Sequence, residues 1–520
     1  MKTNFKLNRR RFLHSSTAAA AAGLFPGLLR ASTPAPKRGG TFRIAVSAGS
    51  TTDSLDPASI TGGPLVMALF GGVCNNLTEI DADGNVIPEL AESFEASADA
   101  KTWIFKVRRG VTFGNGKSLT AKDVIASYNH HRGEETKSAA KALLDQVTDI
   151  RQDGPNTIIF DLQAGNADFP FVAADYHLMI MQANAQGGLD WESGYGTGGY
   201  LLIDHKPGVS VRLKRRDDYW KSDRAWFDEV ELINITDPTA RQNALVTGEV
   251  DAINAVDLKT VQRLSQISSI NIDEVTGTSH YTMPMLTDIA PFDNVDVRLA
   301  VKYAVDREEL LQKILRGHGQ VGNDHPIAPA NQFYAAGLEQ RTYDPDKAKF
   351  HLKKAGFDSL DIEVSTAETA FNGATDAAVL FKESASKAGI NVTVKREPSD
   401  GYWSDVWQKK SVCYSYWNGR PTEDWMFSLA YATGVDWNEA HWSNERFDAL
   451  LSEARSELDN AKRREMYYEM QQIVRDDGGS MIPLFANYVD ASSTRVAHGK
   501  LASNRFLDGW KIVERWWSAE

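Results

Sequence analysis

Alternating apolar and polar positions predict strands in the first half of the chain. In residues 41–47, Phe42 and Ile44 fall on one side and Thr41 and Arg43 on the other, which is typical of a half-buried strand. The same alternation recurs twice, at Trp103, Phe105 and Val107, and at Val209, Val211 and Leu213. Asn-Gly at 115–116 after the second segment and Pro-Gly at 207–208 before the third predict a turn and a hairpin.

Capping residues predict helices, which become more frequent in the second half. Thr120 and Asp123 form a capping box that begins one helix. Asp-Pro at 344–345 begins another, over residues 346–355, which Gly356 ends. A helical pair is expected at 444–457 and 460–476. Strands and helices alternate without a repeat period, so the predicted fold class is α/β in more than one lobe.

The first 31 residues predict an export leader. Arg9-Arg10 precede Phe12-Leu13, and an uncharged, alanine-rich run follows at 15–29. This run is too short and too weakly apolar to span a bilayer permanently. The paired arginines resemble the twin-arginine signal of exported bacterial proteins, and a general secretory leader is the alternative. We therefore expect a removable signal peptide at residues 1–31 and a periplasmic protein.

Composition and net charge limit the classes of partner that the chain is expected to bind. Removing the leader, which carries six positive charges, changes the formal net charge of the 520-residue chain from −12 to −18, and such a surface disfavours nucleic acid and anionic membranes. No other segment has eighteen consecutive apolar residues, so no membrane span is expected. Cys74 and Cys413 lie in apolar or aromatic surroundings and are expected to be buried, unpaired thiols rather than a disulfide. We expect a monomer.

No catalytic or cofactor-binding motif in the sequence has the neighbouring elements that its chemistry requires. Residues 194–199 match the dinucleotide fingerprint in their letters, but a strand-like segment at 200–203 follows where a helix is needed. Signatures of zinc hydrolases, nucleophile elbows and paired cysteines are absent from the sequence, and its eleven histidines are scattered. We therefore predict no enzyme, no cofactor and no metal site.

Aromatic residues concentrate between positions 402 and 442, where eleven occur, including six of the thirteen tryptophans. They are interleaved with polar residues, among them Asn418, Arg420 and Asp436. Flat apolar walls with a few polar groups suit a concave ligand site. Because aromatic residues also fill cores, we expect about two thirds of them to pack internally and a minority to contact ligand.

Segments spread over nearly the whole chain resemble one family. They include Lys-Arg-Gly-Gly-Thr-Phe-Arg at 37–43 and Leu-Thr-Ala-Lys-Asp-Val at 119–124. The other segments are 55–57, 90–93, 103–116, 196–200, 217–220, 291–300, 305–307 and 344–357. In order and spacing they resemble the extracellular solute-binding proteins of ABC importers, in the class that includes dipeptide-, oligopeptide- and nickel-binding proteins.

The resemblance implies a two-lobed, periplasmic-binding-protein-like fold with an extra inserted lobe and mixed sheets. Lobe I would comprise residues 41–80, 197–280 and 491–520, lobe II the insertion 81–196, and lobe III residues 281–490. The ligand cleft would lie between lobes I and III. A solute bound to both lobes favours the closed form, which an ABC permease in the inner membrane would recognise.

One departure from the family constrains the solute. In peptide-binding members, an aspartate after the Trp-x-Gly tripeptide pairs with the free amine of the peptide. Here the sequence is Trp417, Asn418, Gly419 and then Arg420. A guanidinium suits carboxylate or phosphate and repels an ammonium group. We expect a peptide-sized or opine-like solute with an anionic group, bound by these four residues and Tyr416; the alternative is an ion pair of Arg420 with Glu423 or Asp424.

Four further residues are weaker candidates for the substrate site. At 281–286 the family usually carries an apolar strand that ends in asparagine, whereas this chain begins the segment with Tyr281 and has Met283 and Met285 on the same side of such a strand. The two methionines form either an adaptable apolar wall of the site or part of a core. Asp53 lies near the first cleft-lining loop of the family, with a turn or capping role as the alternative.

Two other functions are compatible with an exported chain of this kind. One is a secreted hydrolase that uses acids such as Asp436 or Glu439, although no paired-carboxylate signature supports it. The other keeps the binding fold and carries nickel or haem, which the scattered histidines do not favour. A solute-binding protein remains the leading prediction.

Overall fold

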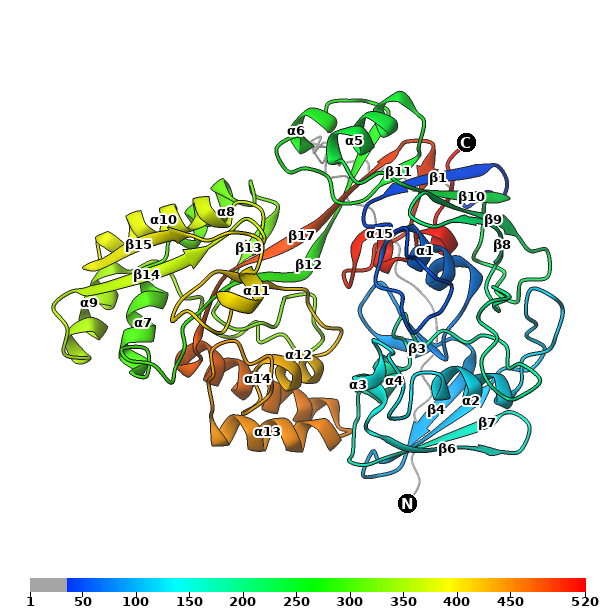
Figure 1. The fold of residues 1–520 in the computed structure, drawn as a ribbon, viewed down its shortest axis with the longest axis horizontal. Coiled ribbons are helices and arrows are strands. Elements are labelled where there is room, and N and C mark those ends of the chain that lie inside the picture. The colour runs from blue at the N-terminus through cyan, green and yellow to red at the C-terminus, as the bar shows by residue number, and fades with distance from the viewer. Residues whose placement is uncertain (1–34) are drawn as a thin grey trace, which may run out of the picture.

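The computed structural model describes residues 35–520, so the predicted leader and its cleavage site lie outside the described residues. We name three lobes by their buried cores. Lobe I is built around Phe42, Tyr200 and Trp516, and lobe II around Phe105 and Phe160. Lobe III contains two adjoining cores, one that includes Phe381 and one that includes Phe427. Figure 1 shows lobes I and II on one side of the molecule and lobe III on the other.

The central strand of lobe I is β1 (Thr41–Val46), which runs parallel to both of its neighbours, β10 and β11. Phe42, Ile44 and Val46 are fully buried, as their alternation predicts. β9 begins at Ser210 and buries Val211 and Leu213, whereas Val209 lies in the preceding turn and is exposed. The remaining elements of lobe I are α1 (Gly63–Ala68), η1 (Leu69–Val73), β8 (Tyr200–Lys206), β9 (Ser210–Arg215), β10 (Glu229–Asn234), α5 (Pro238–Thr247), β11 (Ala252–Ile253), α6 (Val261–Leu264), β18 (Val496–Ala497), α15 (Phe506–Gly509), α16 (Ile512–Arg515) and β19 (Trp517–Ser518).

Lobe II is a four-stranded antiparallel sheet in the order β4, β5, β7, β6, with α2 packed against it. Trp103, Phe105 and Val107 of β5 enter its core, and the predicted capping box of Thr120 and Asp123 begins α2. Its elements are β2 (Thr78–Ile80), β3 (Val86–Pro88), β4 (Ala91–Ala96), β5 (Thr102–Val107), α2 (Ala121–Asn129), α3 (Lys141–Leu144), β6 (Val147–Asp153), β7 (Thr157–Leu162) and α4 (Phe169–Val172).

Lobe III contains the parallel strand pair β14 and β15, with helices on both sides of the pair (Figure 1). The predicted helices at 346–355, 444–457 and 460–476 are confirmed as α9, α13 and α14, each with an aspartate or asparagine N-cap. Its elements are α7 (Val295–Tyr303), α8 (Arg307–Lys313), β13 (Gly319–Val321), α9 (Pro345–Lys354), β14 (Leu360–Thr366), α10 (Ala374–Ser386), β15 (Ile390–Arg396), α11 (Tyr402–Asp405), β16 (Ser415–Trp417), α12 (Glu423–Ala430), α13 (Glu445–Ser456) and α14 (Asn460–Asp477).

Two long antiparallel strands, β12 (Ile270–Pro284) and β17 (Ser480–Ser493), run from lobe I to lobe III. They cross the centre of Figure 1 and belong to a sheet in the order β16, β12, β17, β11, β1, β10, β9, β8, in which β13 also pairs with β17. This pair of hydrogen-bonded strands therefore connects lobe III to lobe I. The mixed α/β class and the two-lobed arrangement with an inserted lobe agree with the prediction.

Lobe III also contacts lobe II at a place away from these strands, where the end of α13 approaches the inserted lobe (Figure 1). Arg463 on α14 forms an ion pair with Asp168 before α4, with 2.6 Å between Nη2 and Oδ1, and both side chains are buried. The amide of Ala167 donates to the carbonyl of Arg455 over 2.7 Å. We call these two contacts the lobe II–III contact.

Two predictions from the sequence concern the cysteines and a membrane span, and both can be compared with the described residues. Cys74 and Cys413 are buried free thiols, as predicted, and burial raises the pKa of Cys74 to about 12. Within residues 35–520, no helix combines the length and the apolar character that crossing a membrane requires.

Candidate functional site

The three lobes enclose a cleft of about 890 Å³. All three lobes and the C-terminal part of the chain contribute to its lining, which consists of Thr61, Ala139, Ala142, Leu143, Asp175, Tyr176, His177, Asn418, Gly419, Arg420, Pro421, Trp425, Ser428, Leu429, Val435, Asp436, Trp437, Tyr488, Asn504, Arg505, Phe506 and Trp510. A narrow extension of about 30 Å³ continues past Asp175 and Tyr176 towards Phe70 and Lys511. A cleft of this size is in the range of peptide-sized ligands and is lined by aromatic rings with a few charged groups.

Arg420 enters the cleft because the preceding edge strand positions it. β16 pairs with β12, with Trp417 opposite His280, and the chain then turns at Asn418 and Gly419. A side chain at Gly419 would place Cβ 2.1 Å from Cβ of Thr278, so only glycine fits there. Arg420 Nη1 donates to the carbonyl of Asn418 over 2.6 Å. Asn418, Gly419 and Arg420 therefore all line the cleft.

The alternative ion pair of Arg420 with Glu423 or Asp424 does not form. Glu423 Oε1 accepts the amide of Phe333 over 2.6 Å, and the carboxylate of Asp424 contacts Arg455 at 3.2 Å. Among the described residues, no carboxylate lies within 4.0 Å of the Arg420 guanidinium. Burial lowers the pKa of Arg420, and the positive charge of Arg505 lowers it further. Arg420 is therefore a half-buried cation with no acidic partner within residues 35–520.

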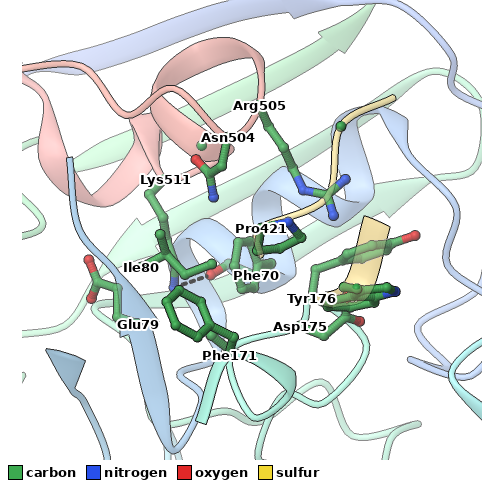
Figure 2. A pocket seen from close by; sticks show the side chains of 14 residues that line it. Phe70, Glu79, Ile80, Phe171, Asp175, Tyr176, Pro421, Asn504, Arg505 and Lys511 are labelled. Carbon is green, nitrogen blue, oxygen red and sulfur yellow. Dashed lines mark hydrogen bonds between the residues drawn. The ribbon is translucent and has the colours of Figure 1, made fainter. Parts of the chain in front are cut away.

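Arg505 is a second arginine of the cleft, and it comes from lobe I. Figure 2 shows its side chain extending from the loop before α15 towards the ring of Tyr176. The guanidinium carbon lies 4.8 Å from the ring centre of Tyr176 and 4.3 Å from that of Trp510, distances typical of cation–π contacts. The nearby carboxylate of Asp175 accepts the amide of His177 at 3.0 Å and its imidazole Nδ1 at 2.7 Å.

Sequence reasoning missed Arg505, Asp175 and Tyr176. No motif marks these residues, and they are separated from Arg420 by 85 residues or more. The sequence places Arg505 only in the predicted C-terminal tail of lobe I. The fold alone brings them to one cleft.

A second pocket, of about 380 Å³, adjoins Arg420 on lobe III. We call it the aromatic pocket; it is lined by Trp403, Trp407, Ser415, Tyr416, Trp417, Asn418, Arg420 and Trp437. Trp403, Tyr416 and Trp437 are exposed by 41%, 38% and 48%. Six of the eleven aromatic residues between 402 and 442 are buried, namely Tyr402, Tyr414, Trp417, Phe427, Tyr431 and Trp442, and of these Trp417 also borders the aromatic pocket. A majority therefore packs internally and a minority faces outwards.

Met283 and Met285 are not in the cleft. Both side chains are fully buried in the Phe381 core of lobe III. Tyr281 packs against the same core, with its ring stacked on Phe371 at 3.9 Å. Both neighbouring strands pair with β12, and the opposite face of β12 is also covered, since His280 and Thr282 are fully buried. The methionines are therefore core residues rather than a wall of the site.

Asp53 is also not among the residues that line the cleft. Its carboxylate accepts the amide of Ser50 over 2.9 Å, and its own amide donates to the Ser50 carbonyl over 3.0 Å. The pattern is that of a side-chain-stabilised turn, which is the alternative that the sequence left open.

The two acids considered for catalysis lie in different surroundings, and a cluster of acids with metal-like spacing already holds a lysine. Glu439 is buried and accepts Trp407 Nε1 over 3.0 Å, whereas Asp436 lines the cleft. Among residues 35–520, one group of three acids, Glu79, Glu89 and Glu514, has metal-like spacing. The ammonium group of Lys221 occupies its centre, 2.7–3.0 Å from the three carboxylates.

The glycine-rich run at 194–199 also has a structural explanation. A side chain at Gly198 would place Cβ 2.2 Å from the carbonyl oxygen of Gly72. The run therefore needs glycine to pack against η1, and β8 follows it, as the sequence predicts. This geometry does not present helix amides to a pyrophosphate.

Comparison with known proteins places the chain among binding proteins. The model of the bacterial extracellular solute-binding proteins, family 5, matches residues 85–439. The chain is 25% identical to di/tripeptide-binding protein 1 of Pseudomonas aeruginosa (strain UCBPP-PA14) over 500 residues, covering 88% of this chain and 92% of that protein. The structure of HbpA2 from Haemophilus parasuis superposes with a TM-score of 0.81 at 20% identity, covering 90% and 98% of the two chains. The binding protein AgaA from A. tumefaciens R10, in complex with agropinic acid, superposes with a TM-score of 0.72 at 22% identity, covering 92% and 98%. The chain belongs to the family 5 bacterial extracellular solute-binding proteins.

Proposed function

We propose that this protein captures a peptide-sized or opine-like solute with an anionic group in the periplasm and delivers it to an ABC permease of the inner membrane. The observation that carries the proposal is the half-buried guanidinium of Arg420, which lines the cleft without an acidic partner among the described residues. A buried cation without a counter-charge is costly, and a carboxylate or phosphate would supply that counter-charge. Two relatives, named for di/tripeptides and bound to agropinic acid, carry solutes of this size.

The proposed site comprises Arg420 with Asn418, Gly419, Tyr416 and Trp417. Arg420 binds the acidic group, the polar groups of Asn418 and Gly419 orient the solute, and the two aromatic residues border it in the aromatic pocket. Because the cleft is lined from three lobes, a bound solute makes all of its contacts only when the lobes are together. Solute binding would thereby favour the form that the permease recognises. Export through a twin-arginine signal belongs to this proposal.

Thermal unfolding tests the proposed function. A ligand that binds the folded chain stabilises it by about 2.7 kcal/mol at a hundred times its dissociation constant. For a chain of this size, we expect an acidic solute from a panel of N-acetylated peptides and opines to raise the melting temperature by a few degrees. The matched neutral amides should raise it less. A panel in which neutral or amine-bearing solutes stabilise the chain and acidic ones do not would contradict the anionic preference.

A further inference from the structure

The cleft contains two arginines that belong to different lobes. Arg420 comes from lobe III, and Arg505 comes from the C-terminal part of lobe I. Neither guanidinium has a carboxylate within 4.0 Å among the described residues. Arg505 instead contacts the ring of Tyr176, towards which it extends in Figure 2, and the ring of Trp510. These contacts orient the guanidinium and leave its hydrogen-bond donors available.

The two positive charges act on each other across the cleft. The charge of Arg505 reaches Arg420, and both charges reach Tyr176 and Tyr488. Asp175 is the acid whose charge reaches both arginines. Its Oδ1 is already hydrogen-bonded to the amide and the imidazole of His177. The other acid that lines the cleft, Asp436, is exposed, and within residues 35–520 neither acid lies within 4.0 Å of either guanidinium, so both arginines remain available to an anionic solute.

From this juxtaposition we infer that Arg505 and Arg420 form one anion site across lobes I and III, which selects solutes carrying two negative charges. The shared chemistry is a pair of acidic oxygen groups, supplied either by two carboxylates or by a phosphate monoester. Each guanidinium can donate two parallel hydrogen bonds to such a group. Bringing both arginines together without an anion is opposed by their repulsion, so the dianion also favours closure.

This inference rests on the proposed function and extends it by naming Arg505 as a specificity-determining residue. The probes are N-acetyl-alanyl-glutamate with two carboxylates, N-acetyl-alanyl-glutamine with one, and the amide of N-acetyl-alanyl-phosphoserine with a phosphate alone. Their affinities are measured by calorimetry on the full mature chain. The unsubstituted protein should bind the glutamate probe at least about tenfold more tightly than the glutamine probe, since one charged hydrogen-bonded group is worth about that much. The phosphate probe separates the two sources of the charge.

The decisive variant is Arg505→Gln. We expect it to reduce the preference for the glutamate probe to less than about threefold, while Arg505→Lys, which keeps the charge, retains part of it. Arg212→Gln in lobe I and Arg446→Gln in lobe III are matched controls, because both arginines are surface residues paired with exposed glutamates. Both controls should keep the full preference.

Two outcomes separate the inference from the function on which it rests. If Arg505→Gln folds and keeps the full preference for the glutamate probe, Arg505 is not part of the site, although the proposed function survives. If the unsubstituted chain binds neutral peptides more tightly than all three acidic probes, the anionic solute itself is wrong, and the inference is overturned with it.

Discussion

At the scale of single residues, the role of a side chain depends on what the fold places over it. Tyr281 and Met283 lie on β12 and Met285 just after its end at Pro284, and all three side chains are covered by the Phe381 core. Arg420 follows a short edge strand instead, and no acid of the described part of the chain pairs with it. Packing thus determined whether a side chain meets the solute.

Met283→Ala tests this assignment. Truncating a fully buried methionine removes apolar contacts and leaves a cavity, so we expect the free energy of unfolding to fall by about 2–5 kcal/mol. Met283→Leu, which keeps the volume, should cost less than about 1.5 kcal/mol. Denaturant unfolding measures both values. Solute affinity should remain unchanged in both variants, and a selective loss of affinity would return Met283 to the binding site.

At the scale of elements, α12 combines good local chemistry with an unusual burial. Thr422 caps the helix by accepting the amide of Trp425 over 3.2 Å, and two acids occupy the first turn, where a helix favours negative charge. Both acids are nevertheless buried. Burial raises the pKa of Glu423 to about 7 and that of Asp424 to about 6, and the negative charge of Asp168 in lobe II contributes to both shifts.

Glu423→Gln tests the pH dependence that follows. The raised pKa means that the native state keeps a proton on Glu423 which the unfolded state releases between about pH 4.5 and pH 7. The contribution of Glu423 to stability is therefore full below this window and is lost as the pH rises through it, by about 2–3 kcal/mol. Glutamine keeps the acceptor for the Phe333 amide and does not titrate. Chemical denaturation at pH 4.5 and 7.5 should show a smaller decrease in stability for the variant than for the unsubstituted chain, and equal decreases would contradict the assignment.

At the scale of the whole molecule, the inserted lobe takes part in holding the other lobes together. The long strands β12 and β17 connect lobes I and III, and the lobe II–III contact joins lobe III to the insertion. The Arg463–Asp168 pair is buried on both sides. Separating the lobes would expose both charges to water, so this pair is formed only when lobes II and III are together.

Asp168→Asn tests this role. The variant leaves Arg463 buried without an acidic partner, a change that typically costs about 3–5 kcal/mol and can be relieved by opening. We expect small-angle X-ray scattering of the solute-free protein to give a larger radius of gyration than for the unsubstituted chain. Arg446→Gln, which breaks an exposed pair with Glu469, should leave it unchanged, because surface pairs are worth about 1 kcal/mol or less. Identical scattering profiles for Asp168→Asn and the unsubstituted chain would refute the prediction.

The amino-acid sequence by itself determined the local elements and the family. β1, β5, α2, α9, α13 and α14 were predictable because alternation, capping residues and helix-ending glycines act over a few neighbouring positions. The loop from Trp417 to Arg420 was also predictable as a site candidate, since its inverted charge is visible in the sequence. These features depend on short-range physics or on an ordered set of segments.

Only the tertiary structure decided which residues meet in the cleft. Arg505, Asp175 and Tyr176 come from distant parts of the chain and carry no local signal, and they reach Arg420 because β12 and β17 bring lobe III over lobes I and II. The same packing buries Met283 and Met285 and separates Glu423 and Asp424 from Arg420. Long-range packing sets burial and the arrangement of charges, and local periodicity contains no information about either.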